Sequence, residues 1–171
     1  MDKLLYVPNP LLRQKAKKIN SVGEDEINIA KKMKEVMLEA PGVGLAANQI
    51  GILKQIVTIF FVNTETKKET QYNLYNPNII SYSKETIIME EGCLSLPEQF
   101  AEIERPKKIS IEYLDDKNKL VRKEVDGVEA RILQHEIDHL SGKLFVDYLS
   151  NLKRNIMIKK VQKYLKIKNN A

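Results

Sequence analysis

The stretch LQHEIDHLSG, Leu133 to Gly142, contains both histidines of the chain, His135 and His139, four positions apart with Glu136 beside the first. Residues four apart in a helix lie one turn apart on the same face, so both imidazoles can reach one metal ion. Glu136 is rotated by about 100° from His135, and there its carboxylate can hold a water molecule and accept its proton. The stretch therefore predicts a metal-hydrolase helix; the alternative is a helix with two core histidines.

The flanking residues predict a buried helix between Asp126 and Gly142. Asp126 with Glu129 three positions later matches a capping box, and Gly142 is expected just past the helix C-terminus. The apolar positions of this helix are Val128, Ile132, Leu133, Ile137 and Leu140. Because they lie almost all the way round the helix axis, we expect the helix at the centre of the fold.

The remaining patterns predict one α+β domain over residues 1–171. Runs rich in β-branched and aromatic residues predict strands at 55–62, 72–76, 79–82, 86–89, 108–114 and 120–125. The last two are expected to form a hairpin. Helices are expected at 27–40 and at about 150–167, the second with Ser150 as its N-cap. The predicted fold is therefore a mostly antiparallel set of strands packed around the central HExxH helix, with a C-terminal helix.

The composition is that of a folded protein, with 43% hydrophobic and 30% charged residues over 171 positions. The first ten residues contain no apolar leader, and no apolar run approaches the length of a membrane span. We therefore expect a cytoplasmic protein with no membrane partner. Cys93 is the single cysteine, which excludes an internal disulfide.

The net charge of +5 is concentrated at the C-terminus. Seven of the 28 Lys and Arg follow Asp147 and no Asp or Glu does, so residues 1–147 carry 21 basic against 23 acidic side chains. The near-neutral body suits an uncharged or mildly charged substrate, and no DNA partner is expected. The basic helix at 150–167 has two interpretations: a solvated outer face, or a surface that binds RNA.

Two histidines are too few ligands for a catalytic metal site, which usually has three protein ligands and one open position. The chain has no third histidine, so the candidates are a carboxylate or Cys93 within the run 90–95. The residues alone leave open whether Cys93 is a ligand or a buried apolar side chain. A thiolate with two imidazoles would suit zinc, iron, cobalt or nickel.

Three segments together resemble the peptide deformylase family: GVGLAANQ at 42–49, EGCLS at 91–95 and QHEIDH at 134–139. Shorter matches at 8–13, 76–77 and 96–99 extend the resemblance to about residues 4–167. The resemblance implies removal of the formyl group from N-formyl-methionyl nascent peptides, with release of formate. The alternatives are another metal-dependent amidase or peptidase, and a non-catalytic ribosome-binding module.

The resemblance also implies roles for individual residues. Cys93, His135 and His139 would bind one divalent metal ion, with Fe²⁺ as the physiological ion and Zn²⁺, Ni²⁺ or Co²⁺ as alternatives. Glu136 would be the general base and then the general acid. The side-chain amide of Gln49 and the backbone N–H of Leu94 would stabilise the oxyanion.

A further set of residues is expected around the substrate. The substrate-binding candidates are Val43, Gly44, Glu91, Gly92, Val128 and Ile132, each of which could equally be a core residue. Arg105 is expected to pair with Glu91 and to support the metal-binding loop, with a surface salt bridge as the alternative. Phe100 departs from relatives that carry a basic residue there, and Arg131 either lines the pocket or points away. The resemblance also suggests that the basic C-terminal helix contacts the ribosome, with a solvated outer face as the alternative.

Overall fold

The computed structural model describes residues 4–170 as a mixed α+β fold. Its helices are α1 (Glu24–Glu39), α2 (Gly127–Leu140) and α3 (Asn151–Asn169), with short 3₁₀ helices η1 (Pro10–Arg13), η2 (Ala47–Ile50) and η3 (Phe145–Tyr148). Its strands are β1 (Gly44–Ala46), β2 (Ile56–Val62), β3 (Glu69–Tyr82), β4 (Thr86–Cys93), β5 (Leu96–Pro106), β6 (Lys108–Leu114) and β7 (Leu120–Asp126). Among these residues, no helix is long and apolar enough to span a membrane.

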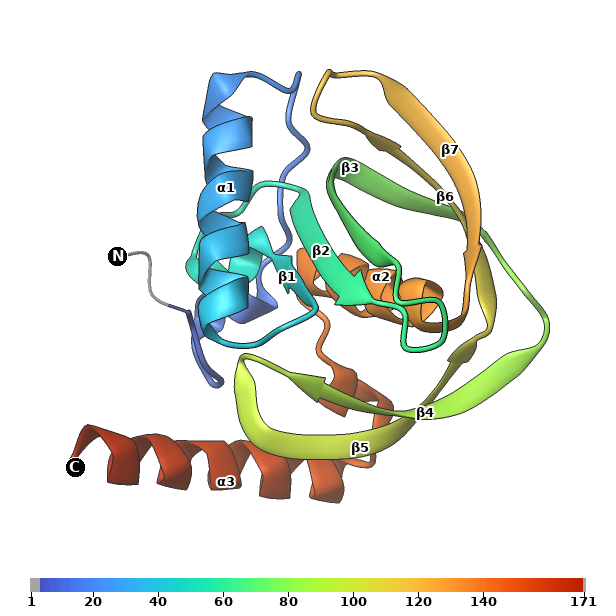
Figure 1. The fold of residues 1–171 in the computed structure, drawn as a ribbon. Coiled ribbons are helices and arrows are strands. Elements are labelled where there is room, and N and C mark those ends of the chain that lie inside the picture. The colour runs from blue at the N-terminus through green and yellow to red at the C-terminus, as the bar shows by residue number, and fades with distance from the viewer. Residues whose placement is uncertain (1–3, 171) are drawn as a thin grey trace.

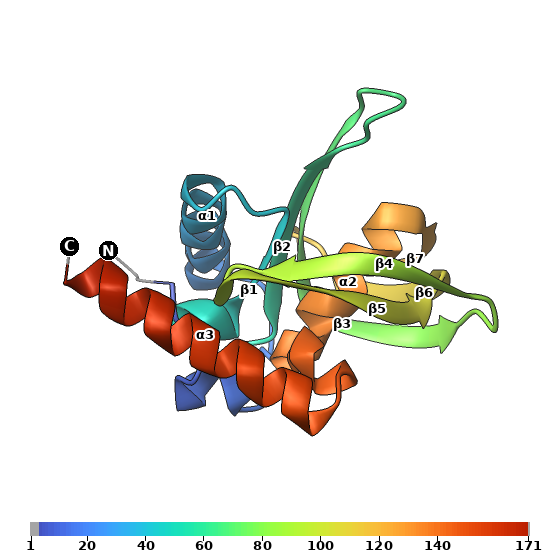
Figure 2. The ribbon, with the colours of Figure 1, turned by 90° about the horizontal axis from the view of Figure 1, so that it is seen from below.

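The strands form two separate antiparallel sheets. The larger sheet has the order β1-β2-β3-β6-β7, and β4 pairs only with β5 in a two-stranded sheet. Figure 1 shows β4 and β5 below the larger sheet, with α3 running along β5 at the bottom of the view. Figure 2 shows the same molecule from below, with α2 beside the two-stranded sheet. The predicted α+β class with antiparallel strands and a C-terminal helix is confirmed.

Helices α1 and α2 pack on opposite faces of the larger sheet. Side chains alternate between the two faces of a strand, so neighbouring residues of β2 belong to different clusters. Val57 and Ile59 pack in the cluster that includes Leu133 of α2. Ile56 packs in the cluster that includes Met33 of α1. Nine of the fourteen residues of α2 are buried, which places its polar side chains inside the protein.

The ends of α2 agree only in part with the helix ends predicted from the sequence. Gly142 follows the helix with φ of 74°, as expected for a glycine just past the C-terminus. The predicted capping box is absent, because the Asp126 side chain makes no cap hydrogen bond. Glu129 instead accepts hydrogen bonds from Tyr72 and Lys123. Its carboxylate is therefore held by the sheet and not by the helix N-terminus.

The strand pattern also differs in two places. Residues 72–76 and 79–82 form one continuous strand, β3, interrupted by register irregularities in its pairing with β6. Strand β5 was not expected, because its prolines and its glutamates at 98, 102 and 104 obscure the apolar alternation. The predicted hairpin is confirmed by the pairing of β6 with β7.

Helix α3 packs on the body along one side only. Its Ser150 N-cap accepts a hydrogen bond from the Lys153 N–H, as predicted. Val161 is fully buried in a cluster with Leu96 and Ile103 of β5. Leu152 and Ile167 are exposed, so most of the helix surface faces solvent.

Candidate active site

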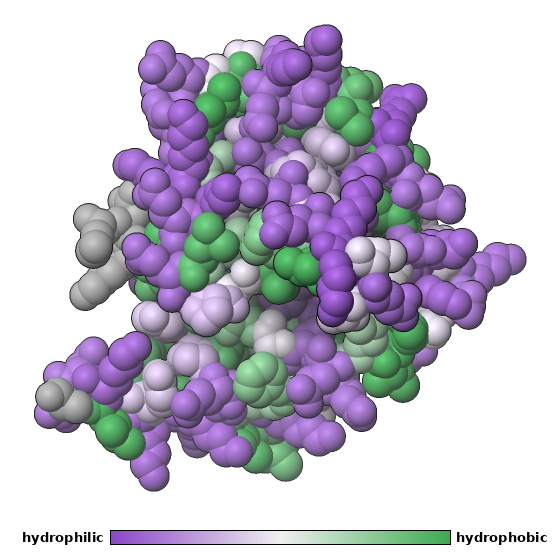
Figure 3. All heavy atoms as spheres, viewed as in Figure 1, coloured by the Kyte–Doolittle hydropathy of each residue, from purple (hydrophilic) through white to green (hydrophobic). Residues whose placement is uncertain are grey.

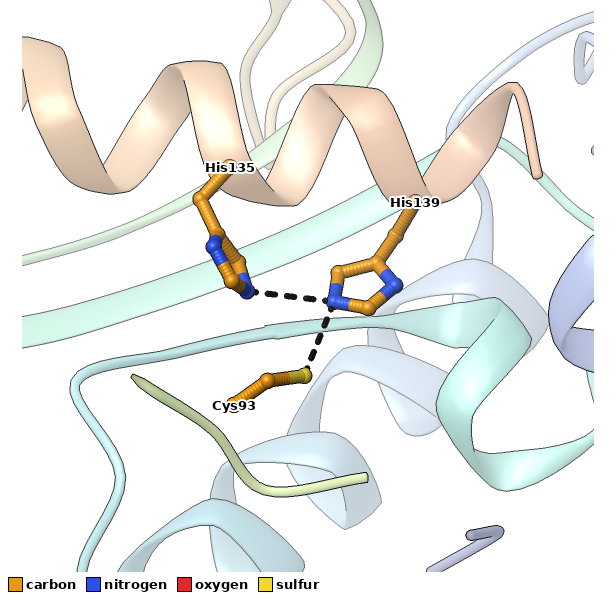
Figure 4. A group of neighbouring side chains, drawn as sticks. All are labelled: Cys93, His135 and His139. Atoms are coloured by element: carbon orange, nitrogen blue, oxygen red, sulfur yellow. Dashed lines mark hydrogen bonds between the residues drawn. The ribbon is translucent and has the colours of Figure 1, made fainter. Parts of the chain in front are cut away.

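The structure brings together the three predicted metal ligands. His135 and His139 project from α2, and Cys93 lies at the end of β4 (Figure 4). The Nε2 atom of His139 lies 3.3 Å from Nε2 of His135 and 3.3 Å from Sγ of Cys93. All three potential ligand atoms lie within 4.8 Å of one another.

This donor group fits a tetrahedral transition-metal ion. Such an ion lies about 2.0–2.1 Å from imidazole nitrogen and about 2.3 Å from a thiolate, so its ligand atoms are about 3.3–3.6 Å apart. Two of the three separations, those of His139 from His135 and from Cys93, agree with that range. A donor set of one thiolate and two imidazoles also has the ligand softness that suits zinc and iron(II).

Glu136 lies on the same helix and lines the adjoining cavity. Its Oε2 atom is buried and has no hydrogen-bond partner among residues 4–170. Burial raises the pKa of Glu136 from 4.5 to about 7. A carboxyl with a pKa near neutrality can both take and return a proton, which general acid-base catalysis requires.

Glu91 binds the ring nitrogen of His135 that faces away from Cys93 and His139. Its Oε2 accepts a hydrogen bond from Nδ1 of His135 at 2.9 Å, and Arg105 donates to both carboxylate oxygens, at 2.5 and 3.0 Å. Burial raises the pKa of Glu91, but hydrogen bonds from His135 and Arg105 outweigh it and hold the pKa well below its usual range. Glu91 is therefore ionised, and it directs Nε2 of His135 away from itself toward Cys93 and His139.

The two histidines predicted to bind the metal have different electrostatic surroundings. Burial lowers the pKa of His135, but hydrogen bonds with Cys93 and Glu91 raise it well above 6.5 overall. Burial and the neighbouring charge of His135 lower the pKa of His139 well below 6.5. His139 is thus neutral at physiological pH, the form in which an imidazole binds a metal.

A cavity of about 510 Å³ opens beside these side chains. Residues 40–44 form one side, residues 92–94 and 96–100 form the other, and Gln49, His135 and Glu136 lie between them. Figure 3 shows a recess near the centre of this face of the protein. The volume is typical of a small-ligand site.

Two glycines of the cavity walls lie close to side chains from other segments. A Cβ on Gly44 would lie 2.5 Å from Oε1 of Glu136, and a Cβ on Gly92 would lie 2.6 Å from the ring of Phe100. Both approaches are closer than carbon atoms tolerate, so the two walls depend on residues without side chains.

Comparison with known proteins agrees with this geometry. A family model described as polypeptide deformylase matches residues 1–155. The chain is 48% identical over 160 residues to the peptide deformylase of Pelagibacter ubique, covering 94% of this chain and 92% of that protein. It is 42% identical over 163 residues to that of Rhizobium meliloti, covering 95% and 93%.

The chain belongs to the polypeptide deformylase family. The resemblance found in the sequence is thereby confirmed. The solved peptide deformylase of Ehrlichia chaffeensis superposes with a TM-score of 0.92 at 34% identity, covering 97% of each chain. A structure of peptide deformylase from the same organism in complex with actinonin has a TM-score of 0.90 at 36% identity, covering 95% of this chain and 96% of that one.

The predicted oxyanion donor Gln49 is held rigidly in this deformylase fold. It lies on η2 and is 1% exposed. Its Oε1 accepts the Ala46 N–H at 3.0 Å, and its Nε2 donates to Ser95 Oγ at 3.1 Å. The same Nε2 lies 3.6 Å from Sγ of Cys93, so one amide hydrogen points toward the predicted metal ligands.

The predicted substrate residues fall into two groups. Val43, Gly44 and Gly92 line the cavity. Glu91 is buried behind His135 and does not line it. Val128 is half exposed and Ile132 packs in the core cluster of the larger sheet, so neither lines the cavity.

The contacts of three residues near the site were not predicted from the sequence and were found only in the structure. Ser95 orients Gln49, and Tyr148 receives a hydrogen bond from Arg105. Arg131 points away from the cavity and binds Glu91. Its position one helical turn before His135 is the sequence signal that could have indicated this contact.

Proposed function

We propose that the chain is a metal-dependent hydrolase that removes the formyl group of N-formyl-methionyl peptides and releases formate. The enzyme class predicted from sequence, a peptide deformylase, is supported by family membership. The observation that carries the proposal is the convergence of Cys93, His135 and His139 next to Glu136, at the edge of an open cavity that Cys93, His135 and Glu136 line. Residues 1–171 would act as one catalytic domain, with α2 as its central helix.

Cys93, His135 and His139 would hold the metal ion. When bound, such an ion lowers the pKa of a water molecule and polarises the formyl oxygen. Fe²⁺ is the proposed physiological ion, with Zn²⁺, Ni²⁺ and Co²⁺ as alternatives of suitable softness. Arg105 supports this centre through Glu91.

Glu136 would take a proton from the attacking water and return it to the departing amine. Its unpartnered Oε2 and raised pKa support both steps. The amide of Gln49 and the N–H of Leu94 would donate to the oxygen on which negative charge develops. Neutral donors suit this role because they stabilise the oxyanion without repelling the metal ion.

An extended peptide would lie between the two walls of the cavity. Val43 and Gly44 belong to one wall and Gly92 to the other. Strand β1 is the edge of its sheet, and β4 pairs with β5 alone, so both walls offer backbone groups to a third strand. The methionine side chain of the substrate needs an apolar pocket along this cleft.

Formate release from formyl-Met-Ala-Ser, compared with acetate release from acetyl-Met-Ala-Ser, tests the proposal. A formyl-specific site should reject the additional methyl group, because the close approach of Gly44 to Glu136 leaves little space. Comparable turnover of both peptides would instead indicate a general amidase. Metal analysis of protein purified without oxygen identifies the ion, and an iron enzyme should lose activity in air faster than its nickel form.

We also propose that α3 contacts the ribosome, consistent with action on nascent chains in the cytoplasm. Seven Lys and Arg and no acidic residue follow Asp147, and α3 presents most of its surface to solvent. Replacing Lys159, Lys160 and Lys163 by Glu should abolish salt-sensitive co-sedimentation with ribosomes while peptide turnover is retained. Co-sedimentation equal to that of the parent protein would argue for a solvated face only.

A further inference from the structure

The three proposed metal ligands come from two structural units that no strand pairing connects. Cys93 belongs to the two-stranded sheet β4–β5, whereas His135 and His139 belong to α2, which packs on the five-stranded sheet. The separation of the thiolate from the imidazoles therefore depends on how β4–β5 is attached to α2. That attachment is made by polar side chains on the face of α2 that carries residues 131, 134, 135 and 138.

Arg131 makes the most extensive of these attachments. It lies one turn before His135 and is 7% exposed. Its Nη1 donates to Oε1 of Glu91 at 2.8 Å and to the Ile103 carbonyl at 2.9 Å, and its Nη2 donates to the Ile87 carbonyl at 2.6 Å. One planar guanidinium therefore binds both β4 and β5 at three points.

The same side chain acts on the support of a proposed ligand. Oε1 of Glu91 accepts from Arg131 and Arg105, while Oε2 accepts from His135 and Arg105. Each oxygen thus has two donors, and Arg131 supplies one of the four hydrogen bonds that fix the carboxylate beside His135. Glu91 lies two residues before Cys93 on β4, so Arg131 holds the strand and the imidazole through one contact.

Arg105 and Gln134 make further contacts between these two units. Arg105 belongs to β5, and it reaches α2 by one bond to Asp138 at 2.8 Å, near the end of the helix. Asp138 is partly exposed, with 23% of its side-chain surface accessible. Gln134 adds one neutral hydrogen bond to the Pro106 carbonyl at 2.9 Å. Arg105 also binds Glu91 of β4, but among residues 4–170 only Arg131 reaches from α2 itself to backbone carbonyls of both β4 and β5.

We propose that Arg131 is a positioning residue that sets the distance between the Cys93 sulfur and the two imidazoles, and thereby the affinity of the site for its metal. The inference rests on the proposed metal site and extends it to a residue outside the ligand set. A lysine would keep the positive charge, but its single ammonium lacks the planar fork that fits three acceptors. A methionine would keep the length and remove every hydrogen bond.

The test compares R131K, R131M and the parent protein, with R122M as control. Arg122 pairs with Glu112 on the surface between β6 and β7, and 69% of its side chain is exposed. The Zn²⁺ affinity of each apoprotein is measured by competition with a chromophoric chelator, well below its unfolding temperature. Replacing a residue that supports a metal ligand typically weakens metal binding by about 10–100-fold, so R131M should bind zinc about 10–100-fold more weakly. R131K should be intermediate, and R122M should equal the parent.

A second readout separates positioning from stability. The Co²⁺-loaded proteins report ligand geometry through their sulfur-to-metal absorption and d–d bands, and R131M should shift or weaken both. A structural role alone would lower the unfolding temperature of the apoprotein but leave zinc affinity and the cobalt spectrum unchanged, which would overturn the inference. If R131M fails to fold, R131K alone tests the inference. A zinc affinity and a cobalt spectrum in R131K equal to those of the parent protein would also overturn the inference. Absence of zinc binding by the parent protein would overturn the metal site itself and this inference with it.

Discussion

Nδ1 of His135 lies 2.9 Å from Oε2 of Glu91, and 4% of the Glu91 side chain is exposed. This buried contact orients the imidazole so that its second nitrogen faces Cys93 and His139. A carboxylate behind a ligand histidine also increases the basicity of the ring. The pair therefore links a buried charge network, formed by Glu91 with Arg105 and Arg131, to the proposed metal centre.

Replacing Glu91 by Gln should destabilise the fold and weaken metal binding together. The change leaves two buried guanidinium groups, those of Arg105 and Arg131, without their shared anion. Loss of one partner from a buried ion pair costs about 3–5 kcal/mol in the free energy of unfolding. Urea unfolding measures this cost, with E112Q on the surface as control. A loss below about 1 kcal/mol in E91Q would contradict the importance assigned to the network.

Replacing Glu136 by Gln should separate catalysis from metal binding. The amide cannot accept a proton, so kcat should fall by about 10²–10⁴-fold. Glu136 is not among the three proposed ligands, so zinc content and affinity should stay close to parental values. Formate release and metal analysis on the same preparation check both statements. An E136Q protein that turns over at the parental rate would exclude Glu136 as the proton carrier.

Replacing Gly44 by Ala should damage the active site more than the fold. The new Cβ would lie 2.5 Å from Oε1 of Glu136, so the carboxylate must move. Displacement of a catalytic group by about 1 Å can lower the rate by about 100-fold. G23A is the matched control, because Gly23 has an ordinary φ of −124° and its added Cβ would meet no atom closer than 3.5 Å. Equal kcat/KM in G44A and G23A would refute the steric argument.

Phe100 should influence which peptides the cleft accepts. It lies opposite Gly92 in the β4–β5 pairing, is 59% exposed and lines the cavity. The described residues that line the cavity include Glu98 and Glu136 but no Lys or Arg. Peptides with an acidic residue after formyl-Met-Ala should therefore be poorer substrates than those with an apolar residue. F100R should improve kcat/KM for the acidic peptide by about fivefold, the effect of one partly exposed ion pair. An unchanged ratio between the two peptides would place the distal residues outside this cleft.

The Asp147 carboxylate should make stability depend on pH in the acid range. Burial raises its pKa, but hydrogen bonds from Arg13 and from the Leu144 N–H outweigh this and lower the pKa below 3.8. A lowered pKa in the folded state adds stability above the pKa of the unfolded chain, and this is lost as pH falls through the folded value. Parent protein and D147N should differ by about 1 kcal/mol at pH 7, and this difference should begin to shrink as pH falls below about 4. Parallel stability curves from pH 7 to pH 3 would contradict this assignment.

The sequence by itself determined the parts that depend on local periodicity. The spacing of His135 and His139 defined a helix face with two imidazoles and a nearby carboxylate. Alternating apolar residues defined the β6–β7 hairpin, and Ser150 marked the start of α3. These features arise from contacts between residues close in the chain, which is why a pattern in the sequence is sufficient to identify them.

Only the tertiary structure decided which distant segments meet. Cys93 lies 46 positions before His139, and its approach to 3.3 Å depends on how a separate two-stranded sheet docks against α2. The orientation of Arg131 toward Glu91, and the absence of Val128 and Ile132 from the cavity, follow from that docking as well. Such contacts depend on packing and burial across the whole fold, because they join segments far apart in the chain.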